Sequence, residues 1–200
     1  MSGKLAEIES RSATARQLDA VIGAMRGIAA ARSREAQRRL PGIRSSASTV
    51  GAAIGAALAH ASGEPARVLE HGARIVIALC AEPGFVGSFN EQIIDHALSR
   101  LTSAQCELLL VGTRGEIVAN ERRLQFAWSS PAASHADDVP SLASRITDAL
   151  YARLADRGVT HVSVIHAVPG IAAHCEIVEH SLIPFDFSRF SVERRSQPPL

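Results

Sequence analysis

The sequence contains few aromatic residues and few cysteines, and neither kind occurs in a pattern that indicates a particular chemistry. Aromatic residues make up only 4% of the chain, whereas hydrophobic residues make up 46% and alanine is frequent. This composition favours helices and close helix–helix contacts over a core of large rings. The three cysteines, Cys80, Cys106 and Cys175, are far apart and form no CxxC pair. They predict buried thiols in a reducing compartment rather than a disulfide framework.

The sequence also lacks a secretory signal and an apolar run long enough to span a bilayer. Its first ten residues are polar, and the apolar stretch 50–61 is short and interrupted by Gly51 and Gly55. The formal net charge of +1 argues against general binding of polyanions. We therefore expect a soluble protein with no direct membrane insertion, whose link to a membrane would run through a partner.

Motifs that carry out bond chemistry are absent as well. No GxxxxGK[ST] loop occurs, and the Gly84–Gly87 turn has no lysine and an acidic neighbour, Glu82. No GxSxG motif occurs either. His161 and His166 are five residues apart on a predicted strand, so they face opposite sides of a sheet. The sequence therefore predicts no catalytic residue, no cofactor site and no metal site.

Residues 1–61 are predicted to form one long helical arm. Apolar side chains recur at steps of three and four residues and form one stripe: Leu18, Val21, Ile22, Met25, Ile28 and Ala29. Pro41 and Gly42 predict a bend or break, followed by a second helical piece over 43–60. An unbroken helix of this length would reach roughly 80 Å, so its narrow apolar stripe requires a partner helix or a surrounding sleeve.

A linker over 62–72 precedes a predicted α/β domain over 73–190, and residues 191–200 form a polar tail. The apolar runs 73–80 and 108–111 are typical of buried parallel strands, and the segment between them predicts a helix capped by Asn90. Ile117 and Val118 suggest a short third strand, followed by a polar loop over 129–139. Pro140 suits the first turn of another helix, and the runs 160–168 and 175–182 predict an antiparallel edge hairpin. The fold class is thus α/β, with a small three-layer domain and a mostly parallel sheet.

The strongest local charge lies on the predicted helix. Between residues 26 and 44 one acid, Glu35, stands against six arginines: Arg26, Arg32, Arg34, Arg38, Arg39 and Arg44. No aromatic residue is interleaved, so stacking on nucleic-acid bases is not indicated. A solvated face, a basic shaft that faces acidic protein surfaces, and a nucleic-acid site all fit this pattern.

Four segments, in order, resemble the gamma subunit of F-type ATP synthases over nearly all of the chain. Residues 24–32, AMRGIAAAR, resemble the family's AMxMVAAxK, and residues 82–90, EPGFVGSFN, resemble its loop SDRGLCGGFN after the first strand. Residues 111–115, VGTRG, and 181–184, SLIP, resemble its G-x-K-G turn and the L-L-P after its hairpin. The chain departs from the pattern at Ile22 and Gly23, at Arg32, and in the loop at Val86 and Ser88. The family also has a long C-terminal helix beyond the position of Leu200.

The resemblance implies a non-catalytic rotor of the central stalk in a proton-translocating complex, peripheral to the cytoplasmic face of a bacterial inner membrane. The first helix would form half of a coiled-coil shaft inside the ring of alpha and beta subunits. The α/β domain would contact the epsilon subunit and the membrane c-ring. We expect Ile22 and Met25 to pack at the rotor interface, with Arg26, Arg32 and Arg34 as its electrostatic contacts. Gly84, Gly87, Phe89 and Asn90 would form a structural loop.

Two other interpretations remain open from the sequence. The chain could be a small α/β enzyme with a helical dimerisation arm and a ligand site in the loop 84–90. It could also be a helical adaptor for an acidic partner.

Overall fold

The computed structural model describes residues 2–60, 72–101, 105–156, 158–170 and 175–186. The predicted tail 191–200 and nearly all of the predicted linker 62–72 therefore lie outside the described residues. The chain divides into two compact units, Met1–Thr49 and Val50–Leu200. The first consists of the greater part of one helix, and the second contains the sheet.

The N-terminal segment forms a single uninterrupted helix, α1, over Ser2–His60. Its 59 residues correspond to about 90 Å of helix. The predicted break at Pro41 is wrong, because the helix continues through this residue. One proline removes a single backbone hydrogen bond, and the long alanine-rich turns on both sides maintain the helix. Whether Pro41 kinks the axis stays a prediction.

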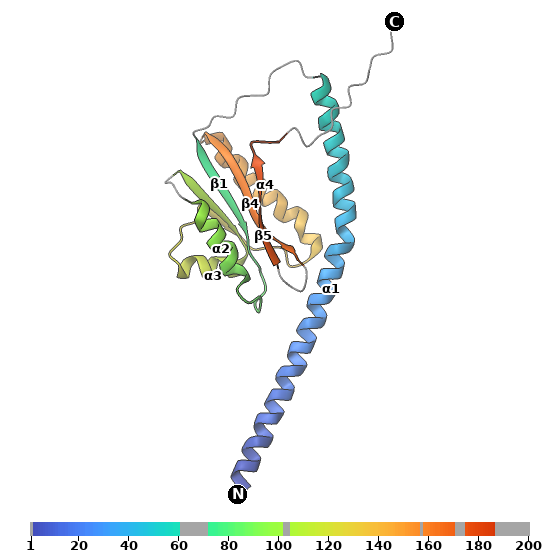
Figure 1. Ribbon diagram of the computed structural model, residues 1–200, viewed down its shortest axis with the longest axis vertical. Helices are drawn as coiled ribbons and strands as arrows, with labels where there is room; N and C mark the ends of the chain where they lie inside the picture. Colours follow the sequence, from blue (N-terminus) through green and yellow to red (C-terminus); the bar gives the residue numbers. More distant parts are fainter. Residues whose placement is uncertain (1, 61–71, 102–104, 157, 171–174, 187–200) are drawn as a thin grey trace. The chain divides into compact units, whose positions relative to one another are not determined.

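The second unit contains one five-stranded sheet in the order β3-β2-β1-β4-β5 (Figure 1). The strands are β1 Ala73–Leu79, β2 Cys106–Val111, β3 Trp128–Ser130, β4 Val159–Pro169 and β5 Cys175–Ile183. The first four pair in parallel, and β5 pairs antiparallel with β4 at one edge. Both buried strands and the edge hairpin of the sequence prediction are confirmed.

Helices cover the two faces of the sheet, which gives the three layers expected for this fold class. They are α2 Phe89–Arg100, α3 Thr113–Glu121 and α4 Val139–Asp156. One apolar cluster joins α2 and α3 to strand residues such as Val76, Leu110 and Ile165. A second joins α4 to alternate residues such as Ile77 and Leu109. Because β1 and β2 are buried on both faces, they are continuously apolar rather than alternating.

The predicted third strand at Ile117 and Val118 is wrong, because these residues lie in α3. Gly112, with a φ of +103°, ends β2 and places the chain for a helix. A side chain here would meet the Cys80 carbonyl oxygen, since an added Cβ would lie 2.6 Å from that atom. The third strand is instead β3, which falls partly in the segment predicted as a polar loop.

Asn90 does not cap α2 as predicted, because the helix begins at Phe89 and Ser88 occupies the capping position. The Asn90 side chain is 5% exposed, and its Oδ1 accepts a hydrogen bond of 2.9 Å from the backbone N–H of Ala81. It therefore fastens the end of β1 to the start of α2.

Glu82 connects three chain segments at the carboxyl ends of the parallel strands. One carboxylate oxygen accepts hydrogen bonds from the backbone N–H of Thr113 at 3.0 Å and of Ala132 at 2.9 Å. The other accepts from the Thr113 hydroxyl at 2.7 Å. Burial alone would raise the pKa of Glu82, but these hydrogen bonds and the nearby charge of Arg114 lower the pKa overall.

A matched pair of leucine truncations should separate the sheet core from the surface of α1. Leu109 is fully buried, whereas Leu18 is 58% exposed. We expect Leu109→Ala to reduce the free energy of unfolding of the α/β unit by about 2–5 kcal/mol, and Leu18→Ala to leave it nearly unchanged. Urea unfolding followed by the fluorescence of Trp128, the single tryptophan, measures both. An equal reduction in the free energy of unfolding for both variants would contradict the assignment of Leu109 to the core.

Replacing Glu82 should destabilise the α/β unit in a pH-dependent way. A carboxyl group with a lowered folded pKa stabilises the protein fully above its unfolded pKa, about 4.3, and the contribution is lost as the pH falls through the folded value. We expect Glu82→Gln to cost about 1 kcal/mol at pH 7, since the partly exposed carboxylate keeps some contact with water.

The difference between Glu82→Gln and the wild type should shrink below about pH 4. Glu121→Gln, at an exposed position of α3, is the control and should have little effect at any pH. A difference for Glu82→Gln that is independent of pH would show that the ionised carboxylate is not what holds the three segments together.

Candidate functional site

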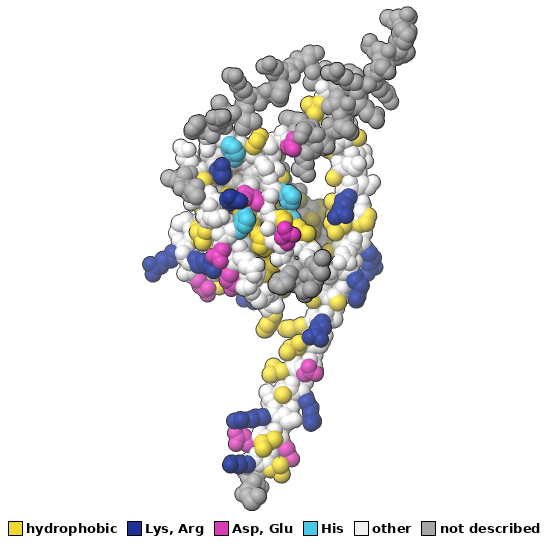
Figure 2. Space-filling model, viewed as in Figure 1, with side chains coloured by type: hydrophobic (Ala, Val, Ile, Leu, Met, Phe, Trp, Pro, Cys, Tyr) yellow, Lys and Arg dark blue, Asp and Glu magenta, His cyan; other side chains and the backbone are white. Residues whose placement is uncertain are grey.

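The surface of α1 carries large apolar side chains that nothing within the described residues covers. Their exposed fractions run from 41% for Leu40 to 64% for Ile8. They are Leu5, Ile8, Leu18, Val21, Ile22, Met25, Ile28, Leu40, Ile43 and Val50. Figure 2 shows hydrophobic side chains interspersed with basic ones along the helix. A row of exposed apolar side chains of this length is typical of a binding surface rather than of a solvated one.

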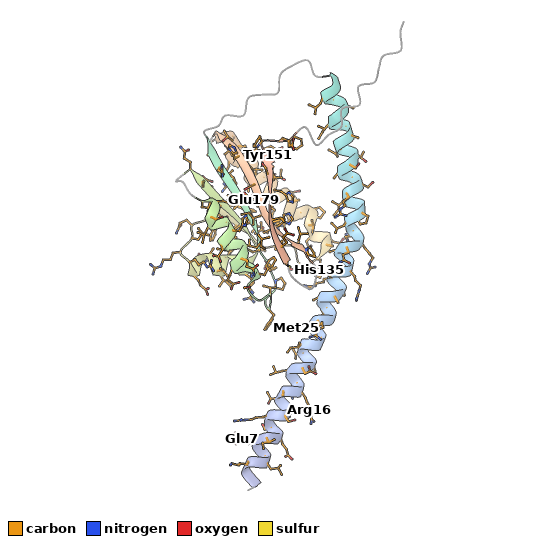
Figure 3. The ribbon with its side chains drawn as sticks, viewed as in Figure 1. Glu7, Arg16, Met25, His135, Tyr151 and Glu179 are labelled. Atoms are coloured by element: carbon orange, nitrogen blue, oxygen red, sulfur yellow. The ribbon has the colours of Figure 1, made fainter. Side chains whose placement is uncertain are left out.

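Helical geometry places the five predicted interface residues around α1, not on one side of it. Ile22 and Met25 lie within one turn of each other on the apolar stripe, and Met25 is labelled in Figure 3. Arg32 follows Met25 by about two turns and shares its side, whereas Arg34 follows by about two and a half turns and faces the opposite side. Arg26 flanks the stripe.

The charge of the basic segment is only partly compensated within the described residues. Arg39 pairs with Glu35 at 3.2 Å, and Arg38 donates to the backbone carbonyl of Arg34 at 3.4 Å. The guanidinium groups of Arg26, Arg32 and Arg34 have no ion pair in the part of the chain that the structure describes. Their charges are therefore available to a partner that carries acidic groups.

The loop between β1 and α2 holds a single aromatic side chain away from the domain. Phe85 is 92% exposed and has a φ of +60°, in the left-handed region. The next glycine, Gly87, has a φ of +58°, whereas Phe89 packs against the core and Asn90 is buried. The sequence prediction of a structural loop did not single out Phe85 for a role. A lone aromatic residue flanked by glycines is the signal that could have done so.

Of the three thiols predicted to be buried, Cys80 is buried, whereas Cys106 is half-buried and Cys175 is exposed. The Cys80 thiol ends the buried central strand, where burial and then the charge of Glu91 raise its pKa to about 12. A thiol with so high a pKa is protonated at neutral pH and unreactive. Among the described residues, no group of three or more His, Cys, Asp or Glu side chains could hold a metal ion. No described helix is both long and apolar enough to cross a membrane.

The comparisons with known proteins agree with these features. The profile of the family described as ATP synthase matches residues 4–198. A chain of the central stalk and c-ring structure of the mitochondrial ATP synthase of Tetrahymena thermophila is 18% identical. It superposes with a TM-score of 0.57 over 80% of this chain and 70% of that chain.

A rotor chain of the Euglena gracilis mitochondrial ATP synthase is 11% identical, with a TM-score of 0.49. That match covers 65% of this chain and 47% of that one. The search of curated proteins returned no match.

The family profile covers almost the whole chain, including both the long helix and the α/β domain. On this ground the chain belongs to the ATP synthase family.

Proposed function

We propose that this chain is the gamma-type rotor subunit of the central stalk in a proton-translocating F-type ATP synthase. In this role it couples ion-driven rotation to ATP synthesis or hydrolysis in partner subunits and carries out no bond chemistry itself. The observation that carries the proposal is the combination of the family match with a helix of 59 residues whose apolar stripe is exposed.

The mechanical role requires a rod that is stiff and a surface that other chains can surround. A continuous helix is the stiffest element that a single chain segment can form, and α1 continues through Pro41. Its exposed stripe, with Ile22 and Met25, needs a covering surface to stop contact with water. One side of it would pack on a second helix, and the remainder would turn against the sleeve of the catalytic ring.

The uncompensated arginines support a sleeve that presents acidic groups. Arg26, Arg32 and Arg34 point in three directions around the helix, which suits a shaft that meets a surrounding ring rather than one flat partner. Charge pairs that are exposed at a moving interface stabilise each state only weakly, so rotation does not have to break a strong bond.

The partners follow from the same role. The alpha and beta subunits would form the ring around α1, and the epsilon subunit and membrane c-ring would contact the α/β domain. The similar structure from Tetrahymena thermophila is that of a central stalk with its c-ring. The subunit would thus be peripheral to a membrane, at the cytoplasmic face of a bacterial inner membrane.

The small-enzyme interpretation receives less support from the described residues. Glu82 and Asn90 fill the base of the loop 84–90 with hydrogen bonds to the protein's own backbone, so these groups are not free to bind a ligand. The Cys80 thiol at the same end is protonated at neutral pH. No described feature favours the adaptor over the rotor.

Placing a charge on the apolar stripe should uncouple the assembled enzyme. We expect Met25→Lys in the complete complex to reduce ATP-driven proton pumping, measured per ATP hydrolysed, by about tenfold. Burying an unpaired ammonium in an apolar contact costs on the order of several kcal/mol, so we expect most complexes to lose this contact. Ala20→Lys, about one and a half turns earlier on the opposite side of α1, is the control and should pump normally. Unchanged coupling in Met25→Lys would refute the assignment of this stripe to the rotor interface.

Removing the charges should weaken the salt-sensitive part of the association with the catalytic ring. We expect the triple variant Arg26→Gln, Arg32→Gln, Arg34→Gln to bind purified alpha and beta subunits less tightly at low salt. The difference from the wild type should disappear above about 0.5 M salt, where such charges are screened. Quantitative co-sedimentation across a salt series measures this. A wild-type affinity that does not depend on salt would exclude the electrostatic role.

A further inference from the structure

The open part of the sheet face that carries α2 and α3 is polar, and the strand pattern explains why. On β4, Ile165 packs under α2, whereas His161 and Ser163 precede it on the same face. The helix α2 ends at Arg100, and within the described residues no other helix covers the amino-terminal end of β4 on this face. The side chains of His161 and Ser163 are therefore half-buried, whereas Ile165 under the helix is fully buried.

Register brings side chains from three strands together at this open end. Arg74 of β1 pairs with His161 of β4, and Ser163 of β4 pairs with Ser181 of β5. With Glu179 they line a hollow of about 250 Å³. This volume is below the roughly 300–1,000 Å³ of sites for drug-sized ligands, so it suits a small molecule. In Figure 2 basic, histidine and acidic side chains gather on this face, around the Glu179 labelled in Figure 3.

The one acidic group of the hollow is already compensated by the protein. The Glu179 carboxylate lies 2.7 Å from Nε of Arg100 and 3.5 Å from Nε2 of His96, both on the last turns of α2. Burial alone would raise the pKa of Glu179, but the Ser163 hydroxyl, the charge of Arg100 and the His96 ring lower it overall. Glu179 therefore stays ionised at neutral pH, and Arg100 offsets its charge.

The remaining polar side chains of the hollow can donate hydrogen bonds, and its other lining residues are apolar. The guanidinium of Arg74 is exposed and has no hydrogen bond or ion pair within the described residues. Nδ1 of His161 lies 2.9 Å from the Thr160 hydroxyl. When this hydroxyl donates to Nδ1, the neutral ring carries its proton on Nε2 and can donate to a ligand. Ser163 affects the pKa of Glu179, yet its Oγ is shielded from water and makes no hydrogen bond of good geometry in the described part of the chain.

We propose that the hollow between Arg74, His161, Ser163 and Ser181 binds a small anion through a carboxylate or phosphate group. The fork of the Arg74 guanidinium matches either group with two parallel hydrogen bonds, and Nε2 of His161 supplies a further donor. With Arg100 and Glu179 offsetting each other, the uncompensated charge of Arg74 makes the hollow net positive, which attracts an anion and disfavours a cation. This site lies at the opposite end of β1 from the loop 84–90 and is independent of the rotor role.

Nuclear magnetic resonance of the full chain tests the proposal directly. The imidazole signals of His161 are followed during titration with inorganic phosphate, at constant pH and at an ionic strength held constant with chloride. We expect shifts that saturate, and a dissociation constant about tenfold higher in Arg74→Gln, which corresponds to the loss of about 1.4 kcal/mol. Arg123→Gln removes an exposed arginine outside the hollow and should bind as the wild type does.

Two further samples make the outcome decisive. Arg74→Lys keeps the charge without the fork and should bind with intermediate affinity, which separates specific recognition from general attraction. A parallel titration with acetate distinguishes a carboxylate ligand from a phosphate ligand, and saturation by either supports the site. Shifts that stay linear with both anions, or equal affinities in Arg74→Gln and Arg123→Gln, would overturn the proposal. None of these readouts depends on assembly with other subunits.

Discussion

The pairing of β1 with a parallel strand on each side is the interaction on which the α/β unit depends. Residues 75–78 of β1 are at most 1% exposed, and they contact helices on both faces of the sheet. Strands buried in this way satisfy their backbone through neighbouring strands, so the packing of both faces depends on the register of β1 with β2 and β4. On β1 the one charged side chain, that of Arg74, consequently lies next to the amino-terminal end of the strand.

In contrast to those of β1, the large apolar side chains of α1 are exposed. Its apolar side chains form a stripe, but nothing within the described residues buries them, so its surface is stabilised only by contacts with other chains or segments. Its charged side chains follow the same pattern, because Arg26, Arg32 and Arg34 have no ion pair within the described residues, whereas Arg39 pairs with Glu35.

Periodicity and apolar runs were sufficient to predict the long helix, the central strands and the edge hairpin, because these features depend on local residue patterns. The failures have tertiary causes. Ile117 and Val118 suggested a strand by β-branching, but the turn at Gly112 and the packing of Ala119 on the core made the segment helical. Asn90 has a good capping side chain, yet its Oδ1 bonds Ala81 of another segment. The hollow was not predictable, because Arg74, His161 and Ser181 meet only through strand register.

The two ends of the sheet illustrate how the same types of residue serve different purposes. At the carboxyl ends of the strands, the Glu82 carboxylate accepts hydrogen bonds from three donors of the protein itself, so it is not available to a ligand. On β5, Glu179 has Arg100 as its partner, and the Arg74 guanidinium at the amino end of the strands has no partner among the described residues. In parallel α/β sheets ligands usually bind at the carboxyl ends of the strands. Here Glu82 links chain segments at the carboxyl ends of the strands, whereas Arg74 at the amino ends can donate hydrogen bonds to an anion.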